Sequence, residues 1–254
     1  MILVLDTGNT NIDIGCIENG EVRSVDRMET SRRRSASEYA VTLECILRLN
    51  GRTPKDFEGA VIASVVPIVT EPLCLAVKRL TGLDALVVGP GVRTGLNIGL
   101  DEPDSIGADL VAAAVAALQD YPMPCAIFDI GTATTISVLD KTGKFLGGAI
   151  MPGLGISMDA LSCITAQLPH VSLEPPKKCV SSNTVDSMKS GAVFGYASAV
   201  DGMLDRIQAE LGTPVAAVAT GGLAPKIVPW CRHRIETDAA LLLRGLWYIW
   251  EKNK

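Results

Sequence analysis

Short apolar runs alternate with polar turns along the chain, and the first three runs predict consecutive strands. Ile2–Asp6, Ile12–Glu18 and Glu21–Met28 each have the length and the apolar, β-branched content of a strand. Asn19-Gly20, which separates the second run from the third, is typical of a two-residue hairpin turn. We therefore expect the chain to begin with a three-stranded meander.

Helical spacing follows the meander. Ser35-Ala36-Ser37-Glu38 has the pattern of a capping box and predicts the start of a helix, which Asn50-Gly51 ends. The apolar face of this helix is predicted to carry Tyr39, Leu43, Ile46 and Leu47. The later elements of this half are predicted as a strand at Gly59–Val66 closed by Pro67, a helix at Glu71–Leu80, a strand at Ala85–Val88, a long loop from Gly89 to about Asp104, and a helix at Ser105–Gln119.

The second half of the chain repeats this plan. Tyr121-Pro122-Met123-Pro124 interrupts the helical pattern and marks the predicted boundary between a domain at residues 1–120 and a domain at residues 121–254. Strands are predicted at Cys125–Asp129, Thr134–Leu139 and Phe145–Ile150, with a turn at Thr142-Gly143 and a final helix at Asp238–Glu251. The pattern indicates two similar α/β domains, with a ligand cleft between them near the carboxyl ends of the strands.

One loop occurs in both halves, directly after the first strand of each. It reads Asp6-Thr7-Gly8-Asn9-Thr10 in the first half and Asp129-Ile130-Gly131-Thr132-Ala133-Thr134 in the second. The glycine permits a sharp turn and a close approach to a ligand. Successive backbone N–H groups and hydroxyls can then bind an anion, while the aspartate can hold a cation beside it. Two copies in matching contexts favour a polyphosphate site over two ordinary turns. Asp129 is interpreted as a cation ligand, and the alternative is that it accepts hydrogen bonds from its own loop.

Asp109 is the candidate general base. It lies in Gly107-Ala108-Asp109, in the first turn of a predicted helix, where an acidic residue is also favoured by the helix dipole alone. Phosphoryl transfer to a hydroxyl requires a carboxylate near that hydroxyl and little other covalent chemistry.

Glycine-rich turns at Gly147–Gly153 and Thr220-Gly221-Gly222 are candidates for lining the nucleotide site, although each could be a plain turn. Asn183-Thr184 has an equally good interpretation as a helix cap. For Arg32-Arg33-Arg34, a solvated surface is favoured over an anion-binding patch.

Composition excludes several classes of function. The formal net charge is −5, and no basic motif indicates nucleic-acid binding. No apolar stretch approaches the roughly 20 residues of a transmembrane helix, and the N-terminus lacks a signal-peptide pattern. The seven cysteines form no C-x-x-C pair, which favours buried free thiols in a reducing cytoplasm over disulfides or a metal site. We therefore expect a cytoplasmic protein that binds neither nucleic acid nor a membrane.

Several motifs in order resemble those of the type III pantothenate kinases, a family of the actin, sugar-kinase and heat-shock-chaperone ATPase superfamily. The resemblance runs from Ile2 to about Asn253. The motifs are D-T-G-N-T-N at Asp6–Asn11, R-R-R-S-A-S-E-Y at Arg32–Tyr39, S-V-V-P at Ser64–Pro67, V-G-P-G-V-x-T-G-L at Val88–Leu96, G-A-D at Gly107–Asp109, D-I-G-T-A-T-T at Asp129–Thr135, G-G-A-I-x-P-G at Gly147–Gly153, N-T-V at Asn183–Val185 and T-G-G-L-A-P at Thr220–Pro225.

The resemblance implies two actin-like (ribonuclease H-like) α/β domains with a nucleotide cleft. It also implies ATP-dependent phosphorylation of pantothenate to 4'-phosphopantothenate, the first step of coenzyme A biosynthesis. Asp109 would be the catalytic base, and the chain would act as a homodimer with Mg-ATP and a monovalent cation, K⁺ or NH₄⁺. The implied ATP-binding residues are Asp6, Thr7, Gly8, Asn9, Thr10, Asn11, Ile12, Asp13 and Thr132. The implied substrate-binding residues are Leu100, Gly107, Ala108, Asp109, Leu110 and Thr184. The implied metal ligands are Asp129 for the monovalent cation and Asp6 for Mg²⁺.

The acceptor half of these motifs departs from the family pattern. Leu110 stands where the family usually has an arginine after G-A-D, and Leu100, preceded by Gly99, stands where it has a substrate-contacting tyrosine. Arginine is the natural partner of a carboxylate such as that of pantothenate. Two alternatives therefore stand beside pantothenate kinase: a kinase of a different small alcohol, and a catalytically inactive nucleotide-binding paralogue with a regulatory role.

Overall fold

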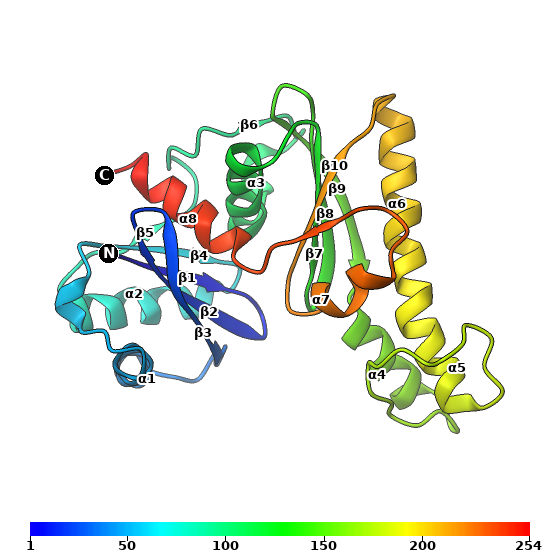
Figure 1. Cartoon of the computed structure of the whole chain (residues 1–254). Helices are drawn as coiled ribbons and strands as arrows, with labels where there is room; N and C mark the ends of the chain where they lie inside the picture. The colour runs from blue at the N-terminus through cyan, green and yellow to red at the C-terminus, as the bar shows by residue number, and fades with distance from the viewer. The chain divides into compact units, whose positions relative to one another are not determined.

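The computed structural model divides the chain into two compact units, which are described separately (Figure 1). It describes the backbone of residues 1–254 and every side chain except that of Asp104. The first unit contains Met1–Leu96, Asp101–Gln119 and Ala240–Lys254, and the second contains Asn97–Leu100 and Asp120–Ala239. Two segments therefore belong to the other unit than a division at residue 120 would give. Asn97–Leu100 pack with the second unit, and Ala240–Lys254 pack with the first.

A five-stranded sheet forms the centre of the first unit. Its order is β3-β2-β1-β4-β5, with β1 at Ile2–Thr7, β2 at Asn11–Glu18, β3 at Glu21–Glu29, β4 at Gly59–Ser64 and β5 at Leu86–Val87. β1, β2 and β3 form the predicted antiparallel meander, whereas β4 runs parallel to β1. β5 is only two residues long, shorter than the predicted strand at Ala85–Val88.

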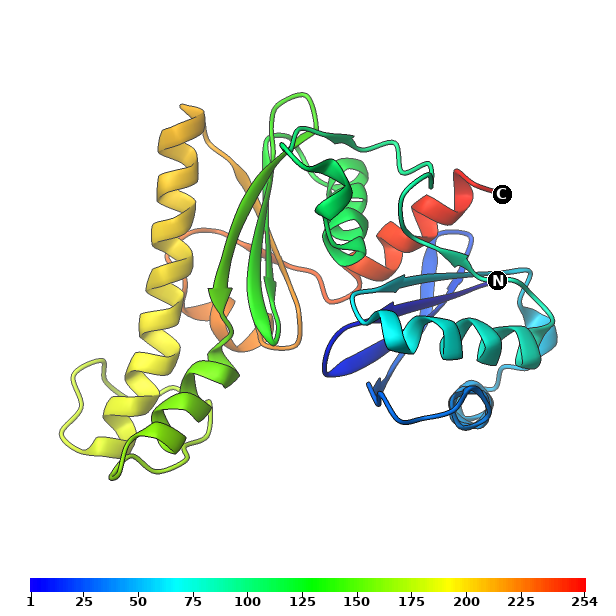
Figure 2. The ribbon, with the colours of Figure 1, turned by 180° about the vertical axis from the view of Figure 1, so that it is seen from behind.

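Helices cover both faces of this sheet. They are α1 at Ala36–Leu49, α2 at Pro67–Thr81, α3 at Ala108–Asp120 and α8 at Leu241–Glu251, with 3₁₀ turns η1 at Pro54–Asp56 and η2 at Pro103–Ser105. Leu3 and Leu5 of β1 pack with α1 and α2, whereas Ile2 and Val4 pack with α3 and α8. The ribbon of these helices can be followed from behind in Figure 2. Because successive strand residues point to opposite faces, a strand covered on both sides is apolar throughout.

Three helices of this unit begin at other residues than predicted. α2 begins at Pro67, four residues earlier than expected, because proline is well tolerated in the first helical turn. α3 begins at Ala108, since Pro103–Ser105 form the separate turn η2, and α8 begins at Leu241. The capping box of α1 is confirmed: Ser35 accepts from the Glu38 N–H, and the Glu38 carboxylate accepts from the Ser35 N–H.

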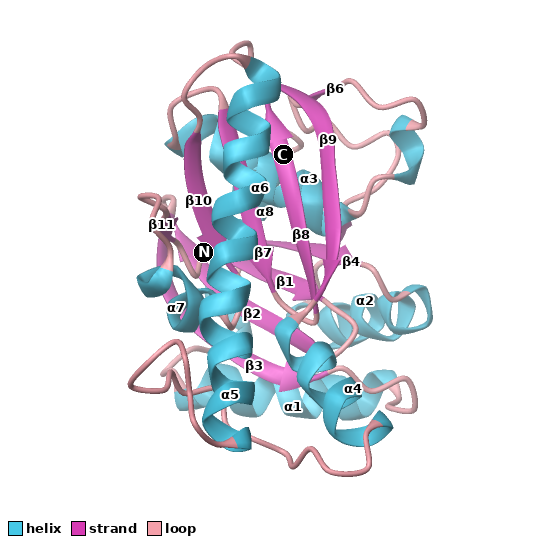
Figure 3. Cartoon of the chain, turned by 90° about the vertical axis from the view of Figure 1, so that its right-hand side faces the viewer, coloured by secondary structure: helices cyan, strands magenta, loops and turns pink.

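The second unit has a six-stranded sheet of order β11-β10-β7-β8-β9-β6 (Figure 3). Three of its strands were predicted: β7 at Cys125–Ile130, β8 at Ala133–Leu139 and β9 at Lys144–Pro152. The other three were not: β10 at Ala216–Thr220 and the short strands β6 at Asn97–Ile98 and β11 at Glu236–Thr237. β7, β8 and β9 form an antiparallel meander and β10 runs parallel to β7. The strand plan of the first unit is therefore repeated.

The helices of the second unit include one continuous helical segment that changes type. α5 at Thr184–Ser190 continues through a π-helical turn, η3 at Gly191–Gly195, into α6 at Tyr196–Leu211. The other helices are α4 at Leu154–Ile164, α7 at Ala224–Ile227 and the 3₁₀ turn η4 at Val228–Trp230. Val200 and Leu204 of α6 join the core formed on Phe128 and Ile130 of β7, so α6 lies along the sheet (Figure 3).

The cysteines correct one expectation. All seven are free thiols, but only Cys16 and Cys125 are buried, whereas Cys45, Cys163 and Cys179 are exposed. Exposed thiols had not been expected. Among the described residues, no helix combines the length and the apolar character needed to cross a bilayer.

Candidate active site

The repeated loop forms a tight turn in each unit. The first turn, Gly8-Asn9-Thr10, joins β1 to β2, and its Gly8 N–H donates to the Asn11 carbonyl at 2.9 Å. Thr30, which directly follows β3, holds this turn from the side. Its hydroxyl donates to the Gly8 carbonyl at 2.7 Å, and its N–H donates to the Thr10 carbonyl at 2.9 Å. Because both ends of the turn are held by one residue that follows a neighbouring strand, the backbone of the turn is held in place without a ligand.

The predicted ATP-binding residues of this loop differ in whether their side chains can contact a ligand. Asn9 and Thr10 are exposed at the tip of the turn, whereas the side chains of Thr7 and Ile12 are buried. Thr7 and Ile12 could therefore reach a ligand only through their backbone. The Asp13 carboxylate is bound by Arg27 through two hydrogen bonds of 2.5 and 2.9 Å. The Asp13 side chain is thus committed to an ion pair on the sheet.

Asp109 lies near the same edge of the first sheet as this turn. It is the second residue of α3 and its Oδ1 accepts the Leu110 N–H at 2.8 Å. A Cβ atom built on Gly107 would overlap Asp109 Oδ1 and would lie 3.7 Å from Val65 Cγ1. The Val65 N–H in turn donates to the Thr7 carbonyl at 3.1 Å, at the end of β1. The carboxylate is therefore placed at the ends of β1 and β4, where the first turn begins.

The surroundings of Asp109 favour the role of a base. Burial raises the pKa of its carboxyl, and the hydrogen bonds from backbone N–H groups only partly oppose this effect. A desolvated carboxylate with a raised pKa binds a proton more strongly than an exposed one. This is the direction in which a general base must be shifted to act near neutral pH. Gly107 is required beside it, because any side chain there would displace the carboxylate.

The second turn, Gly131-Thr132-Ala133, joins β7 to β8 and is enclosed by two glycine backbones. The Gly131 N–H donates to the Ala133 carbonyl at 3.1 Å. A Cβ atom on Gly153 would overlap the Thr132 carbonyl oxygen and lie 2.7 Å from that of Gly131. A Cβ atom on Gly221, whose φ is +87°, would overlap the Asp129 carboxylate. Both predicted glycine-rich turns thus pack directly against this loop.

Parallel pairing of β10 with β7 explains this convergence. The pairing aligns Thr220 with Asp129, so the loop that begins at Gly221 leaves the sheet beside the second turn. The Leu223 N–H donates to the Ile130 carbonyl at 3.1 Å and holds the two loops together. Thr132 remains exposed at the tip. Among the described residues, no group of three or more His, Cys, Asp or Glu side chains is placed to hold a metal ion.

The remaining predicted residues are divided between the two units. Leu100 belongs to the second unit, where its Cδ2 atom would lie 3.3 Å from a Cβ atom on Gly147. Leu110 is a half-buried residue of α3 in the first unit. Thr184 begins α5, and Asn183 caps that helix by accepting the Asp186 N–H at 2.9 Å, so the cap interpretation of Asn183 is confirmed.

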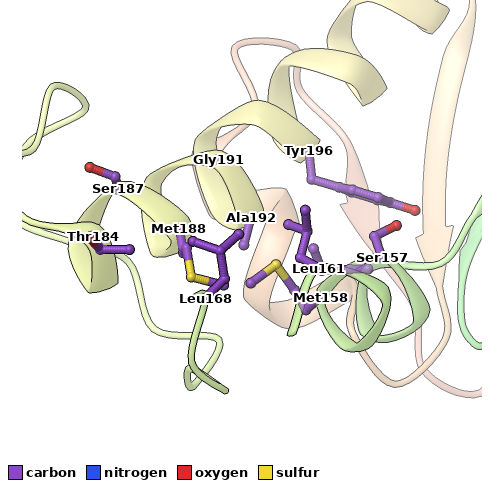
Figure 4. Close-up of a pocket in the computed structure, with 11 residues that line it drawn as sticks. Ser157, Met158, Leu161, Leu168, Thr184, Ser187, Met188, Gly191, Ala192 and Tyr196 are labelled. Carbon is purple, nitrogen blue, oxygen red and sulfur yellow. The ribbon is translucent and has the colours of Figure 1, made fainter. Parts of the chain in front are cut away.

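Thr184 and Tyr196 line opposite ends of one cavity of about 390 Å³ in the second unit (Figure 4). Most of its wall is apolar and comes from α4, α5 and η3, with Met158, Leu161 and Met188 among the lining side chains. The Tyr196 hydroxyl lies 2.6 Å from Thr134 Oγ1 and 3.0 Å from the Pro152 carbonyl oxygen. The far end of this cavity is therefore connected to the strands that flank the second turn.

Sequence reasoning did not single out Thr30 or Tyr196 as site residues. Thr30 lies two residues after the predicted third strand, Glu21–Met28, and that position was the only available signal for it. Tyr196 contacts residues 62 and 44 positions away in the chain, so no local motif marks it.

The comparisons with known proteins agree with this arrangement. A family model described as type III pantothenate kinase matches residues 2–206. The chain is 39% identical over 253 residues to the type III pantothenate kinase of Moorella thermoacetica and 42% identical over 254 residues to that of Anaeromyxobacter dehalogenans strain 2CP-C, in both cases covering 100% of each chain.

A solved ROK hexokinase from Thermus thermophilus has a similar fold, with a TM-score of 0.55 and 14% sequence identity over 100% of this chain and 99% of that one. This likeness confirms the expected fold class, the actin-like architecture of two α/β units shared with sugar kinases. The family model covers most of the sequence and the two relatives match its whole length, so the chain belongs to the type III pantothenate kinase family.

Proposed function

We propose that this protein is a kinase that transfers the γ-phosphate of ATP to pantothenate and forms 4'-phosphopantothenate, the first step of coenzyme A biosynthesis. The observation that carries the proposal is the partly buried carboxylate of Asp109 beside the first turn, in a chain that matches type III pantothenate kinases over its full length. The comparisons support pantothenate over a different alcohol, and they lend no support to an inactive paralogue.

We assign the ATP phosphates to the loop Asp6–Asp13 and to Thr132. Both turns present exposed polar residues on a backbone that neighbouring strands hold in place. Mg²⁺ usually binds through one or two carboxylates together with phosphate oxygens and water. The absence of a cluster of three or more protein ligands among the described residues fits this mode. Both oxygens of Asp13 are bound by Arg27, so we assign Mg²⁺ to Asp6, near the end of β1 and two residues before the first turn. When bound, the ion would neutralise charge on the phosphates.

We assign a monovalent cation, K⁺ or NH₄⁺, to Asp129. A carboxylate beside the backbone carbonyls of a tight turn offers the oxygen atoms that such an ion prefers, and Gly221 leaves room for the Asp129 side chain. This cation would lie next to the phosphate contact assigned to Thr132.

Asp109 acts in this mechanism as the general base. Its carboxylate accepts the proton of the primary hydroxyl of pantothenate while the hydroxyl oxygen forms a bond with the γ-phosphorus. The bond from the γ-phosphorus to the bridging oxygen breaks at the same time, and ADP leaves with that electron pair. Burial raises the pKa of Asp109, so its carboxylate is a stronger base than an exposed one. General base catalysis of this kind contributes about 10²- to 10⁴-fold in rate.

The acceptor is assigned to Leu100, Gly107, Ala108 and Leu110, with Thr184 reaching it in a homodimer. Leu110 cannot form the ion pair that an arginine would offer to the pantothenate carboxylate. A hydrogen bond to a charged group contributes about 1.5–3 kcal/mol, which corresponds to roughly 10- to 100-fold in affinity. We therefore expect a raised KM for pantothenate and not a loss of phosphoryl transfer. The free thiols fit a reducing cytoplasm, where we place the enzyme.

An ADP-release assay tests this proposal. The purified protein would be given Mg-ATP and K⁺ or NH₄⁺, with and without millimolar pantothenate, and the product would be identified by mass. We expect ADP release that depends on pantothenate and falls by about 10²- to 10⁴-fold in Asp109→Asn. Asp84→Asn is the matched control, since it neutralises an exposed carboxylate of the same unit that pairs with Lys78. Full activity in Asp109→Asn would refute the assigned mechanism, and no dependence on pantothenate would refute the assigned substrate.

A further inference from the structure

We propose that Tyr196 is a positioning residue, whose hydroxyl holds the second turn in the conformation that receives ATP phosphate. This inference rests on the proposed function, which places ATP phosphate at Thr132. Tyr196 itself is buried and begins α6, directly after the π-helical turn η3. A π turn inserts an extra residue into a helix and is frequent at functional sites.

The hydroxyl of Tyr196 connects both strands that meet the second turn. Thr134 lies on β8 and pairs with Ile130 across the hairpin, and Pro152 ends β9 and pairs with Ala133 of the turn itself. Pro152 also precedes Gly153, whose backbone packs against the turn. One hydroxyl thus reaches two positions whose backbones border the same loop.

One of these two contacts satisfies a buried group, the Thr134 hydroxyl. The Pro152 carbonyl can only accept a hydrogen bond, so it takes the single proton of the Tyr196 hydroxyl. The Thr134 hydroxyl is fully buried and must then donate its own proton to the Tyr196 oxygen. Removing the Tyr196 hydroxyl would leave the Thr134 hydroxyl without that acceptor, and a buried polar group without a partner is destabilising. We expect the flanking strands to shift in response.

The ring of Tyr196 lies on the wall of the 390 Å³ cavity, so packing holds it incompletely on that side (Figure 4). The two hydroxyl contacts therefore contribute to its orientation. This also means that the ring connects the cavity wall, formed by α4 and α5, to the second turn.

The first unit holds its own turn by a comparable arrangement. The Tyr39 hydroxyl, on the first helix after that meander, donates to the Ser31 carbonyl at 2.7 Å and accepts the Ser31 N–H at 3.1 Å. Ser31 directly follows Thr30, the residue that binds both ends of the first turn. A buried tyrosine hydroxyl therefore fixes the end of the third strand of the meander in each unit.

The test compares Tyr196→Phe, Thr134→Val and the double variant in the full-length protein. Ser198→Ala is the control, because it removes an α6 hydroxyl that donates to the Phe194 carbonyl, one turn earlier in the same continuous helical segment. The dissociation constant of Mg-ATP would be measured by calorimetry, the KM of ATP and of pantothenate by ADP release, and Tm by thermal melting. One buried hydrogen bond corresponds to about a three- to tenfold change in an equilibrium constant.

We expect Tyr196→Phe to raise the Kd and the KM of ATP by about three- to tenfold, with the KM of pantothenate changed less than twofold. The double variant should be little worse than the worse single variant, because both remove the same contact. A lower Tm with an unchanged Kd and KM of ATP would overturn the proposal, since Tyr196 would then have only a structural role. The same conclusion would follow if Ser198→Ala gave an equal effect or if the wild type bound no Mg-ATP.

The calorimetric measurement separates this proposal from the proposed function. If the wild type binds Mg-ATP but does not phosphorylate pantothenate, the assigned substrate is wrong, and the Kd ratio of Tyr196→Phe to wild type still decides the role of Tyr196. If pantothenate is phosphorylated and Tyr196→Phe binds Mg-ATP like the wild type, the proposed function stands and the positioning role is refuted.

Discussion

Replacement of Gly153 by alanine provides a direct test of the geometry of the second turn. Gly153 caps α4 with φ −64° and ψ 154°, a backbone conformation that alanine adopts without strain. The only obstacle to the new methyl group is therefore steric. Its carbon atom would lie 2.6 Å from the Thr132 carbonyl carbon, and closer still to the carbonyl oxygen, where ordinary contacts begin at 3.4 Å. The turn must therefore move by about 0.8 Å or more.

Such a displacement should reduce the catalytic rate more than it reduces the stability of the fold. A misplacement of about 1 Å at a positioned group can reduce the rate by about 10²-fold. Forcing an additional methyl group into a packed site typically destabilises a protein by about 1–3 kcal/mol. For a chain of this size, that corresponds to a fall in Tm of roughly 2–10 °C. We expect kcat/KM for ATP in Gly153→Ala to fall by about 10²-fold at a temperature where the protein is fully folded.

Gly155→Ala is the matched control. It lies two residues further along, and a Cβ atom there would have nothing within 4 Å. Alanine is also the better helix former, so this variant should keep its activity and its Tm. ADP release and thermal melting of the three proteins decide the matter. If Gly153→Ala keeps its KM for ATP and its kcat within twofold of the wild type, the turn does not bind phosphate in the described conformation and the reasoning fails.

Three further predictions follow from the same contacts. Because burial raises the pKa of Asp109, acidification should reduce kcat/KM at a higher pH than it would for an ordinary aspartate. The raised pKa also means that the free energy of unfolding should fall as the pH rises through this pKa. Asp109→Asn should abolish both pH dependences, as measured by rate profiles and by thermal melting at several pH values. Gly221→Ala should lose both activity and stability, since its Cβ atom would overlap the Asp129 carboxylate. The control is Gly212→Ala, which is also at positive φ but has open space around its Cβ atom. It should show normal kinetics and, in urea unfolding, only the conformational penalty of about 1–2 kcal/mol. Gly245→Ala in α8 should lower the free energy of unfolding by about 1–3 kcal/mol despite its helix propensity, because the methyl group would collide with the α3 backbone; an unchanged urea midpoint would contradict this packing.

Local features of the fold could be predicted from the sequence because their causes are local. The capping box at Ser35–Glu38 and the Asn19-Gly20 hairpin depend on side chains within a few residues of each other, and both are present. The turns after Asp6 and Asp129 were located by the same kind of pattern. Their position at strand ends follows from the observed pairing of β1 with β4 and of β7 with β10.

The parts of the site that escaped prediction depend on contacts far apart in the sequence. Thr30 binds the first turn from 22 residues away, and Tyr196 reaches Thr134 across 62 residues. A glycine at position 221 could be recognised as a turn residue, but only the parallel register of β10 and β7 shows that it packs on Asp129. The short strands β6 and β11 contain two residues each, too few to produce a periodic pattern. The roles of the individual site residues stay predictions until the variants are measured.

The last helix gives the chain an unusual order of assembly during synthesis. Leu243, Leu246 and Ile249 of α8 belong to the same core as Ile2 and Val4 of β1, and the Trp250 ring occupies the space above Gly59. The first unit therefore cannot complete its core until α8 has been made. At about 5–20 residues per second, the ribosome needs on the order of 10–50 s to pass from β1 to α8. The second unit, whose last residue is Ala239, is complete before then. The half that is translated first is thus the half that finishes folding last.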